Sequence, residues 1–395
     1  MKYITLSNGF VLPIIGMGTY PQKEVLKELI PKAVQLGYTM FDTSDNYMNE
    51  EFYGQGYYRA IDDGDNLITI TKFSSPYEDF RWVYEKSIKN IYNSNQRGKL
   101  VYLLHWPYPH LYPQIWEFME ELYIEGKCEA IGVCNFETKH LSVLLENCRI
   151  KPMINQIECH PLFSQRDICR MCEENDIQIM AYSPIARMDS RLISHHFLNE
   201  LAKKYAKSVV QIILRWHIEQ GRIIIPATKN QDRLEENIDL FDFKLTPQEV
   251  EKIDGLECGL RIRFNPNERF SEDEISAMKR ESLFVNTKRK TDNTKIIIYG
   301  AGTYGRQLYR FLTRLGTRID FFCQTLAGEM DVIYETPVIT MDELENLEGN
   351  KIVLIAIENE KISHTIKQNI EKKILHDVAI YECAKLVKTF YPQNK

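Results

Sequence analysis

Eight short apolar runs alternate with amphipathic stretches between residues 16 and 256, and this alternation limits the possible folds more than any other feature of the chain. The apolar runs are GMGTY, TMFD, LITITK, LVYLLH, EAIGV, PMINQ, IQIMAY and RIIIP. The helical stretches between them include residues 23–36, 78–92, 113–126, 139–147, 166–175 and 198–220. Apolar strands that alternate with helices are typical of βαβ units with parallel strands. Eight such units predict an α/β fold of the TIM, or (β/α)8, barrel type.

The chain has 395 residues, more than such a barrel needs, so further elements are expected at its ends. Residues 4–15, ITLSNGFVLPII, place Asn-Gly between two apolar runs, which predicts a β-hairpin ahead of the barrel. Towards the other end, a polar and basic stretch leads to a fresh apolar strand, KIIIY. The sequence therefore predicts a barrel over residues 1–270, a linker over 271–293 and a small doubly wound, Rossmann-like α/β domain over 294–395.

The charge balance and the apolar runs exclude several classes of partner. The chain has 49 Lys and Arg against 55 Asp and Glu, and the net charge of −6 creates no field that would gather nucleic acid or anionic lipid. The N-terminus lacks the apolar stretch of a signal peptide, and the longest apolar runs are too short to span a bilayer. We expect a cytoplasmic protein with no nucleic-acid or membrane partner.

Nine cysteines are scattered along the chain, and one pair, Cys169 and Cys172, forms a CxxC motif. A metal or redox site of this kind would need a second CxxC or a strand-to-helix turn before it, but this pair lies within a polar, helix-like run. The favoured interpretation is therefore free thiols and no metal site, with a functional CxxC as the alternative.

Titratable residues close three successive predicted strands, which end on Asp42, Lys72 and His105, and Tyr47 follows five residues after the first of them. Each has an ordinary explanation: a helix cap, a solvated lysine, a core histidine and a packing aromatic. Because parallel strands end at one mouth of a barrel, we expect the four to meet there. A lysine ammonium lowers the pKa of a nearby tyrosine towards the working range, and an aspartate keeps that lysine charged. The set predicts a proton donor, with His105 orienting a carbonyl or relaying the proton.

Longer motifs carry a resemblance. They run from Leu6 to about residue 270 and read LSNGFVLPIIGMGTY, FDTSDNY, ITITK, LLHWP, EAIGVCNF, INQIECHP, IMAYSP and IPATKNQDRLEENIDLFDFKLTPQEVEKIDGLE. On these motifs the chain resembles the aldo-keto reductase family. The resemblance implies a TIM barrel that reduces carbonyls with a nicotinamide dinucleotide. Tyr47 would be the general acid, Lys72 and Asp42 would tune it, and His105 would place the substrate carbonyl.

The same resemblance implies a cofactor site along the barrel mouth. Thr19 would contact the cofactor from the first loop, Tyr182 would stack on the nicotinamide, and Ser183 and Ile185 would begin the pyrophosphate loop. The other implied contacts are Cys134, Asn135 and Gln156 at the carboxamide, and Thr228, Lys229, Arg233, Glu236 and Asn237 at the adenosine end.

Three departures from the family pattern bear on this site. Cys134 stands where the family usually has serine, and the segment IARMDSRL lacks the usual small residues of the cofactor loop. Ala227 replaces a lysine that usually contacts the 2′-phosphate of NADP, while Arg233 remains and Lys229 lies close by. We therefore expect NADP as the cofactor, with NAD as the alternative.

The C-terminal part has a glycine pattern of its own. The stretch KIIIYGAGTYGRQLY places Gly300, Gly302 and Gly305 between a strand and a helix, as a dinucleotide site requires. The next strand, however, ends on Cys323-Gln324 rather than on an acidic residue. This part is similar to small nucleotide- or nucleotide-sugar-binding modules of bacterial sugar-modifying and capsule enzymes. The alternative is that the glycines only permit close helix packing.

Taken together, the sequence predicts an NAD(P)H-dependent oxidoreductase that reduces an aldehyde or ketone to an alcohol, with the proton from Tyr47. Tyr20, Trp106 and Tyr108 would form an aromatic wall for a small, partly apolar carbonyl substrate. The alternative is a cofactor-binding regulatory or scaffold protein of the same fold in a sugar or capsule pathway. The complete set of four titratable residues favours the enzyme.

Overall fold

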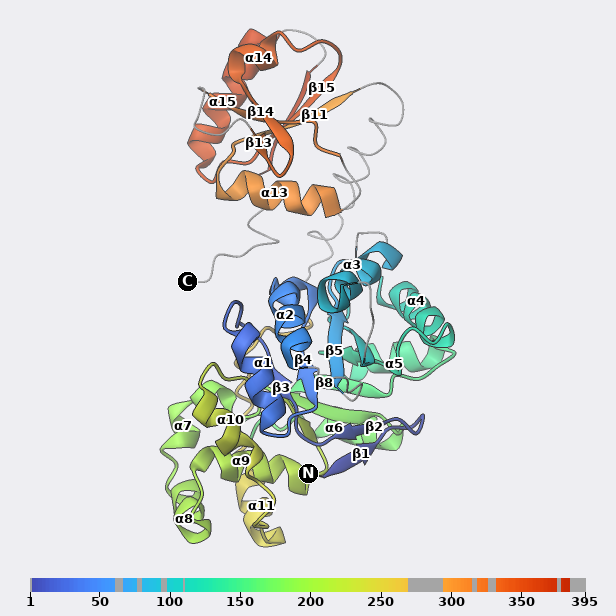
Figure 1. Cartoon of the computed structure of the whole chain (residues 1–395), viewed down its shortest axis with the longest axis vertical. Helices are drawn as coiled ribbons and strands as arrows, with labels where there is room; N and C mark the ends of the chain where they lie inside the picture. The colour runs from blue at the N-terminus through green and yellow to red at the C-terminus, as the bar shows by residue number, and fades with distance from the viewer. Residues whose placement is uncertain are drawn as a thin grey trace. The chain divides into compact units, whose positions relative to one another are not determined.

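The computed structural model describes residues 2–60, 67–76, 80–93, 98–108, 111–268, 294–314, 318–325, 332–374 and 378–383. The chain divides into two units, one of residues 1–76 and 80–270, and one that holds the chain from residue 271 onwards (Figure 1). The predicted linker, residues 271–293, lies outside the described residues. Among those described, no helix is both long and apolar enough to cross a membrane.

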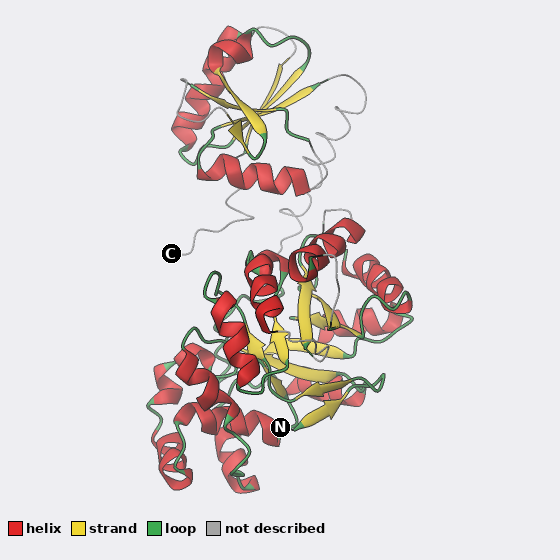
Figure 2. Cartoon of the chain, viewed as in Figure 1, coloured by secondary structure: helices red, strands yellow, loops and turns green. Residues whose placement is uncertain are grey.

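Eight parallel strands form the sheet of the first unit, and they neighbour one another in chain order. Parallel bridges from Ile15 to Ile224 and from Gly18 to Ala227 also join the first strand region to the last. The sheet therefore curls round on itself, which is consistent with the predicted TIM barrel (Figure 2). The strands are β3 (Met17–Gly18), β4 (Met40–Asp42), β5 (Ile68–Phe73), β6 (Lys99–Leu104), β7 (Ala130–Cys134), β8 (Ile154–Glu158), β9 (Gln178–Tyr182) and β10 (Ile223–Ile224).

Helices lie on the outer side of this sheet (Figure 2). The longer ones bury an apolar face. In α1, Leu26, Leu29 and Ile30 are fully buried and share a core cluster with residues of the sheet and of α2. The helices are α1 (Leu26–Gln35), α2 (Glu50–Ala60), α3 (Phe80–Tyr92), α4 (Tyr112–Ile124), α5 (Thr138–Asn147), α6 (Arg166–Glu174), α7 (Ser190–Ile193), α8 (His196–Tyr205), α9 (Val209–Glu219), α10 (Gln231–Ile238) and α11 (Pro247–Asp254), with 3-10 turns η1 (Asp45–Tyr47) and η2 (Ala186–Met188).

The helix predicted over residues 198–220 was wrong as a single element. The chain leaves α8 at Ala206, whose φ of 51° is left-handed, and begins α9 at Ser208. The Ser208 side chain accepts from the amide of Gln211, and the Gln211 side chain accepts in return from the amide of Ser208. This capping box satisfies amides that would otherwise lack partners, so it starts a new helix.

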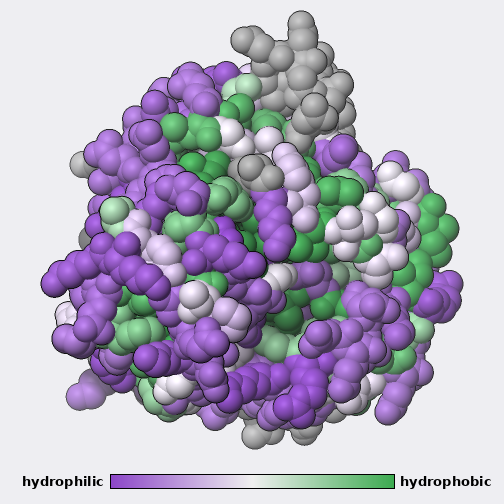
Figure 3. All heavy atoms as spheres, turned by 90° about the horizontal axis from the view of Figure 1, so that it is seen from below, coloured by the Kyte–Doolittle hydropathy of each residue, from purple (hydrophilic) through white to green (hydrophobic). Residues whose placement is uncertain are grey.

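The hairpin predicted ahead of the barrel is confirmed. Strands β1 (Tyr3–Thr5) and β2 (Val11–Pro13) pair in antiparallel fashion. Gly9 has a φ of 85°, which glycine adopts without a steric penalty, in the turn that follows Asn8. The face drawn in Figure 3 is mostly hydrophilic, with hydrophobic side chains in its central hollow and along one edge.

The second unit has a six-stranded sheet in the order β13-β14-β12-β11-β15-β16, parallel except for β13. Helices pack on both faces of this sheet. Ile296 and Ile298 of β11 share a core cluster with apolar residues of α13, whereas Ile297 and Tyr299, on the other face, share one with residues of α14 and α15. Its description as a Rossmann-like module stays a prediction. The elements are β11 (Lys295–Tyr299), α13 (Thr303–Arg314), β12 (Phe321–Gln324), β13 (Val332–Ile333), β14 (Thr336–Thr340), α14 (Met341–Glu345), β15 (Lys351–Ile355), α15 (Glu360–Lys373) and β16 (Val378–Glu382).

Candidate active site

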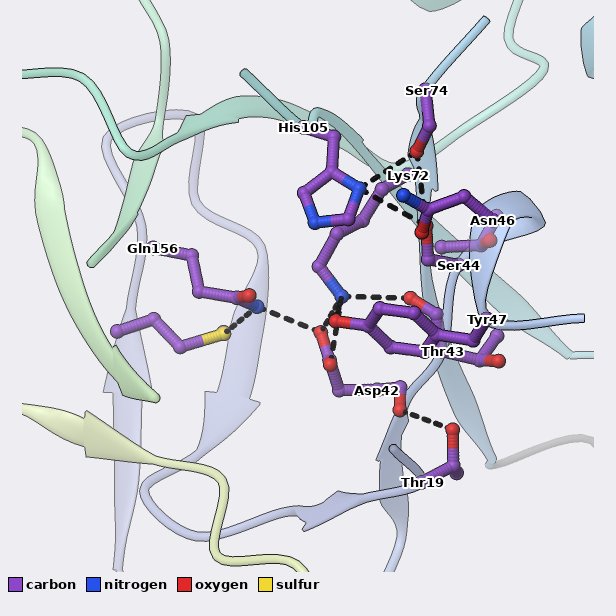
Figure 4. Close-up of polar contacts among 12 residues, drawn as sticks. Thr19, Asp42, Thr43, Ser44, Asn46, Tyr47, Lys72, Ser74, His105 and Gln156 are labelled. Atoms are coloured by element: carbon purple, nitrogen blue, oxygen red, sulfur yellow. Dashed lines mark hydrogen bonds and ion pairs between the residues drawn. The ribbon is translucent and has the colours of Figure 1, made fainter. Parts of the chain in front are cut away.

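Lys72 is the centre of the polar cluster at the barrel mouth. Its Nζ donates to both carboxylate oxygens of Asp42, at 2.8 and 2.7 Å, and to the carbonyl oxygen of Thr43 at 2.7 Å. It also donates to the hydroxyl of Tyr47 at 3.2 Å (Figure 4). Asp42 ends β4, Lys72 lies near the end of β5, and Tyr47 ends the turn η1 that follows β4. The ends of two adjacent strands therefore bring these three side chains together, as the sequence predicts.

Burial and charge oppose each other in this cluster. Lys72 is fully buried, which disfavours its ammonium and is the largest single effect, but the charge of Asp42, its hydrogen bonds to Lys72 and the smaller effects of Tyr47 and Cys134 together raise the pKa of Lys72 above its usual value. Burial likewise raises the pKa of Tyr47, to about 12, although Lys72 acts in the lowering direction. Lys72 therefore lowers the pKa of Tyr47, as expected, but desolvation of the phenolate is the larger effect. The expectation that the pKa of Tyr47 falls below its usual value is wrong.

His105 follows β6 and faces the same cluster (Figure 4). Its Nδ1 lies 2.7 Å from the hydroxyl of Ser74 and 3.2 Å from that of Ser44. The imidazole meets the Tyr47 ring edge-on, with 5.8 Å between the ring centres. The sequence reasoning missed both serines, although each stands two residues after Asp42 or Lys72 at the end of a strand. Their hydroxyls hold one nitrogen of the imidazole and so set the orientation of the ring.

Four of the residues predicted to contact a cofactor lie around these strand ends. Gln156 of β8 donates to Asp42 Oδ1 at 2.7 Å (Figure 4). Thr19 donates to the carbonyl oxygen of Asp42 at 2.9 Å. The hydroxyl of Tyr182 donates to Asn135 Oδ1 at 2.7 Å. These contacts place the predicted residues at one mouth of the barrel. Thr19 and Gln156 are both hydrogen-bonded to Asp42.

Cys134 ends β7 and is fully buried. Burial raises the pKa of its thiol well above the usual range, against the lowering effect of Lys72. The thiol is therefore protonated at neutral pH, and Cys134 takes part in the site as a small neutral side chain.

Two segments farther along the chain hold the other predicted cofactor residues. Ser183 and Ile185 follow β9, and the backbone has positive φ at Ser183 and again over 186–188. Thr228 is buried just before α10, and its hydroxyl accepts from the amide of Asn230. On or beside α10 lie the exposed Lys229 and Arg233, the half-buried Glu236 and the buried Asn237.

Lys229 and Arg233 are the positively charged members of this group. Within the part of the chain that the structure describes, no carboxylate lies within ion-pair distance of either side chain. Ala227, beside them, is exposed and adds no charge. The two cations are therefore available to an anionic group at this end of the site.

The predicted aromatic wall is unevenly exposed. Tyr20 is 37% exposed, and its ring centre lies 5.0 Å from that of Tyr47. Trp106 and Tyr108 are only 5% and 2% exposed. Trp106 stacks on His105, with 5.8 Å between the ring centres. Of the three aromatics, Tyr20 is thus the one that presents substantial surface beside the candidate proton donor.

The glycines of the second unit occupy the turn between β11 and α13. Gly300 has a φ of 111°, which disfavours any other residue. A Cβ at Gly305 would lie 1.6 Å from the carbonyl oxygen of Gly300, whereas one at Gly302 would meet nothing within 4 Å. Close packing therefore explains the first and third glycine but not the second.

All nine cysteines are free thiols, and none of them forms a disulfide. In the CxxC pair, Cys169 contacts the carbonyl oxygen of Ser164, and Cys172 contacts the side chain of Asn155. The two thiols therefore have different partners. Among the described residues, no group of three or more His, Cys, Asp or Glu side chains is placed to hold a metal ion.

Comparison with known proteins gives one consistent result. Residues 14–257 match the pattern described as "Aldo/keto reductase family". The chain is 36% identical over 271 residues to the glyoxal reductase of Bacillus subtilis, covering 67% of this chain and 96% of that protein. It is 34% identical over 268 residues to the methylglyoxal reductase DkgA of Escherichia coli O157:H7, covering 67% and 97%.

A solved structure agrees in fold. The crystal structure of a Bombyx mori aldo-keto reductase in complex with NADP superimposes with a TM-score of 0.61 at 31% identity, covering 67% of this chain and 96% of that one. The match to the family pattern, these identities and the curled parallel sheet agree over the first unit. On this evidence, the chain belongs to the aldo/keto reductase family.

Proposed function

We propose that the chain is an NADPH-dependent reductase of small aldehydes or ketones in which Tyr47 gives the proton. Its family and its reductase relatives make it an NAD(P)H-dependent oxidoreductase. One observation carries the assignment of the proton: Lys72 Nζ, held on both oxygens of Asp42, donates to the hydroxyl of Tyr47. The experiment that tests the whole proposal is an assay of a panel of aldehydes, keto acids and keto sugars with NADPH and with NADH.

Each residue of the cluster has a task in moving that proton. The pKa of about 12 keeps the Tyr47 hydroxyl protonated at neutral pH, so a proton is available to a carbonyl oxygen. When the proton leaves, the ammonium of Lys72 stabilises the phenolate, and Asp42 keeps Lys72 charged and in place. With its Nδ1 held by two serines, His105 has Nε2 as the nitrogen that we assign to the substrate carbonyl.

The residues of the barrel mouth suit a nicotinamide dinucleotide phosphate. Asn135 and Tyr182 would hold the nicotinamide end. Lys229 and Arg233, which lack carboxylate partners among the described residues, would bind the 2′-phosphate. NADPH, when bound, supplies the hydride that the reduction needs. A solved relative is described in complex with NADP, which supports the same cofactor here.

The first prediction concerns the choice between the two nicotinamide cofactors. We expect kcat/KM to be at least about tenfold higher with NADPH than with NADH, because Lys229 and Arg233, two cations without carboxylate partners among the described residues, would bind the 2′-phosphate. Arg233→Ala should lower kcat/KM for NADPH about ten- to a hundredfold, because it removes a charge-assisted hydrogen bond. The kcat/KM for NADH should stay within about twofold of the wild-type value. Arg170→Ala, an exposed arginine of α6, is the control. A wild-type preference for NADH would contradict this cofactor assignment.

For the substrate we propose a class of compounds, small aldehydes or ketones, and no single compound. The curated relatives are named for the reduction of glyoxal and methylglyoxal. The exposed ring of Tyr20 beside Tyr47 suits a small, partly apolar carbonyl compound. A regulatory protein of the same fold would not need the Tyr47–Lys72–Asp42 arrangement, so we favour catalysis.

For the second unit we propose a separate nucleotide-type site of the Rossmann kind at the turn of Gly300, Gly302 and Gly305. The support is that β11 neighbours β12 on one side and β15 on the other, so the turn after β11 lies where the strand order reverses. Ligands of open parallel sheets bind at such points.

We expect a nucleotide sugar to stabilise this unit. The probe is UDP-glucose, and the measurement is thermal unfolding of the full chain, in which binding raises the melting temperature of the second unit. Gly302→Asp should abolish that rise without changing the melting temperature of the free protein, because its side chain meets open space and its charge repels phosphate. Unchanged melting with UDP-glucose and with ADP would contradict the proposed site and leave only the packing role of Gly300 and Gly305.

A further inference from the structure

One cysteine of the CxxC motif has a partner that the motif does not contain. Cys169 lies in α6, Cys159 directly follows β8, and their sulfurs lie 3.5 and 3.6 Å from the same carbonyl oxygen, that of Ser164. A hydrogen-bonded turn over residues 160–163 brings the chain back from β8 towards α6. Cys172, the other cysteine of the motif, is fully buried and contacts an asparagine side chain of β8. The fold therefore brings together Cys159 and Cys169, which we call the thiol pair.

A buried guanidinium lies beside the thiol pair. Arg222 precedes β10, is only 8% exposed, and has its guanidinium carbon 5.0 Å from the ring centre of Trp216. Among the described residues, no carboxylate lies within ion-pair distance of Arg222, and its Nη1 is buried without a hydrogen-bond partner. A buried charge is costly unless an anion compensates it. Both the charge of Arg222 and a hydrogen bond from it act on Cys169, so the thiolate of Cys169 is the anion within its reach.

The two thiols of the pair differ in acidity and in exposure. A hydrogen bond from Cys159 lowers the pKa of Cys169 to about 7, although burial opposes this, and Arg222 adds to the lowering. The same hydrogen bond, together with burial, raises the pKa of Cys159 well above its usual value. Cys169 is therefore partly ionised at neutral pH, whereas Cys159 keeps its proton. Because Cys169 is partly exposed and Cys159 fully buried, a nucleophilic thiolate faces solvent with a second thiol behind it.

We propose that hydrogen peroxide converts the thiol pair into a reversible disulfide, with Cys169 as the attacking thiolate, Cys159 as the resolving thiol and Arg222 as the group that activates Cys169. This modification does not depend on the proposed carbonyl reduction.

The chemistry of the step takes two water-forming reactions. The Cys169 thiolate attacks one peroxide oxygen, so an S–O bond forms, the O–O bond breaks, and the leaving hydroxide takes a proton from solvent to become water. The sulfur of Cys159 then attacks the sulfenic sulfur of Cys169, so the S–S bond forms and the S–O bond breaks. The thiol proton of Cys159 leaves with the hydroxyl group as a second water. The two sulfurs lose two electrons in total, and these reduce the peroxide.

The test treats the full chain with hydrogen peroxide, alkylates it with N-ethylmaleimide during denaturation and digests it with trypsin. The arginines of this region put Cys159, Cys169 and Cys172 into three separate peptides, of residues 150–166, 167–170 and 171–187. Mass spectrometry should find the first two peptides linked after oxidation, the link broken by dithiothreitol, and Cys172 alkylated throughout. A link between the second and third peptides would overturn the proposal in favour of the CxxC pair. Alkylated Cys159 and Cys169 after oxidation would overturn it as well.

Two kinds of variant assign the roles within the site. Arg222→Gln should slow disulfide formation about tenfold or more, because the thiolate of Cys169 loses its cation, whereas Arg222→Lys keeps the charge and should retain most of the rate. Arg170→Gln, at an exposed arginine next to Cys169 in the chain, is the matched control and should react as the wild type does. Cys159→Ser keeps a hydrogen-bond donor but cannot form the disulfide, so Cys169 should stop at the sulfenic acid, which dimedone labels. Wild-type rates in Arg222→Gln would refute the role of Arg222, and Cys169 without dimedone in Cys159→Ser would refute its role as the attacking thiolate.

Discussion

Replacing Tyr47 with phenylalanine should lower kcat for carbonyl reduction by about a hundred- to ten-thousandfold, the usual contribution of a positioned general acid. The phenyl ring keeps the packing against Tyr20 and His105 and loses only the hydroxyl that contacts Lys72. Lys72 keeps its bonds to Asp42, so the free energy of unfolding should change little. Initial rates with a good aldehyde substrate, together with urea unfolding curves, measure both quantities.

Measuring NADPH binding to the Tyr47→Phe variant distinguishes a loss of proton transfer from damage to the cofactor site. The dissociation constant for NADPH, from the quenching of protein fluorescence, should stay within about threefold of the wild-type value. Tyr3→Phe, in the exposed hairpin, is the control and should retain full activity. With a pKa of about 12 for Tyr47, reduction should also show no loss assignable to this group up to about pH 10. Wild-type turnover by the phenylalanine variant would refute the role of Tyr47 as the proton donor.

The barrel was predictable because its sequence pattern is local. Every residue of β5, β7 and β8 is buried, apolar residues recur in each of these short runs, and helical stretches separate them. The break at Ala206 was not expected, since alanine carries no turn signal, although the Ser208–Gln211 capping box two residues later was visible in the sequence. Local periodicity predicts elements well and their interruptions poorly.

The residues of the candidate site also fall into those that local sequence pattern predicts and those that it does not. Asp42, Lys72 and His105 could be grouped from the sequence because each closes a strand, and strand ends meet in a barrel. Ser44 and Ser74 were missed because a serine after a strand is usually a turn or cap residue. The return of the segment after α11 to the end of β8 was not expected either, because it depends on the amides of Ile262 and Arg263, which donate to the carboxylate of Glu158 more than a hundred residues earlier in the chain. No short-range pattern carries that information.

Lys72→Met should give the other large effect, on stability and activity together. Methionine fills most of the buried volume but leaves the carboxylate of Asp42 without its ammonium partner in a buried site. Breaking a buried pair in this way costs about 3–5 kcal/mol of unfolding free energy. Because folding raises the pKa of Lys72, the pair contributes fully at pH 7 and loses its contribution only at strongly alkaline pH, so urea unfolding at pH 7 measures it.

A double variant separates the structural role of Lys72 from its catalytic role. Asp42→Asn with Lys72→Met removes both charges, so much of the lost unfolding free energy should return, and the introduced amide oxygen could still accept the hydrogen bond from Gln156. Activity should stay about a hundredfold or more below wild type, because no cation remains to stabilise the phenolate of Tyr47. If the double variant regained activity together with stability, Lys72 would only support the fold. Low activity in a stable protein would instead place its ammonium in the chemistry.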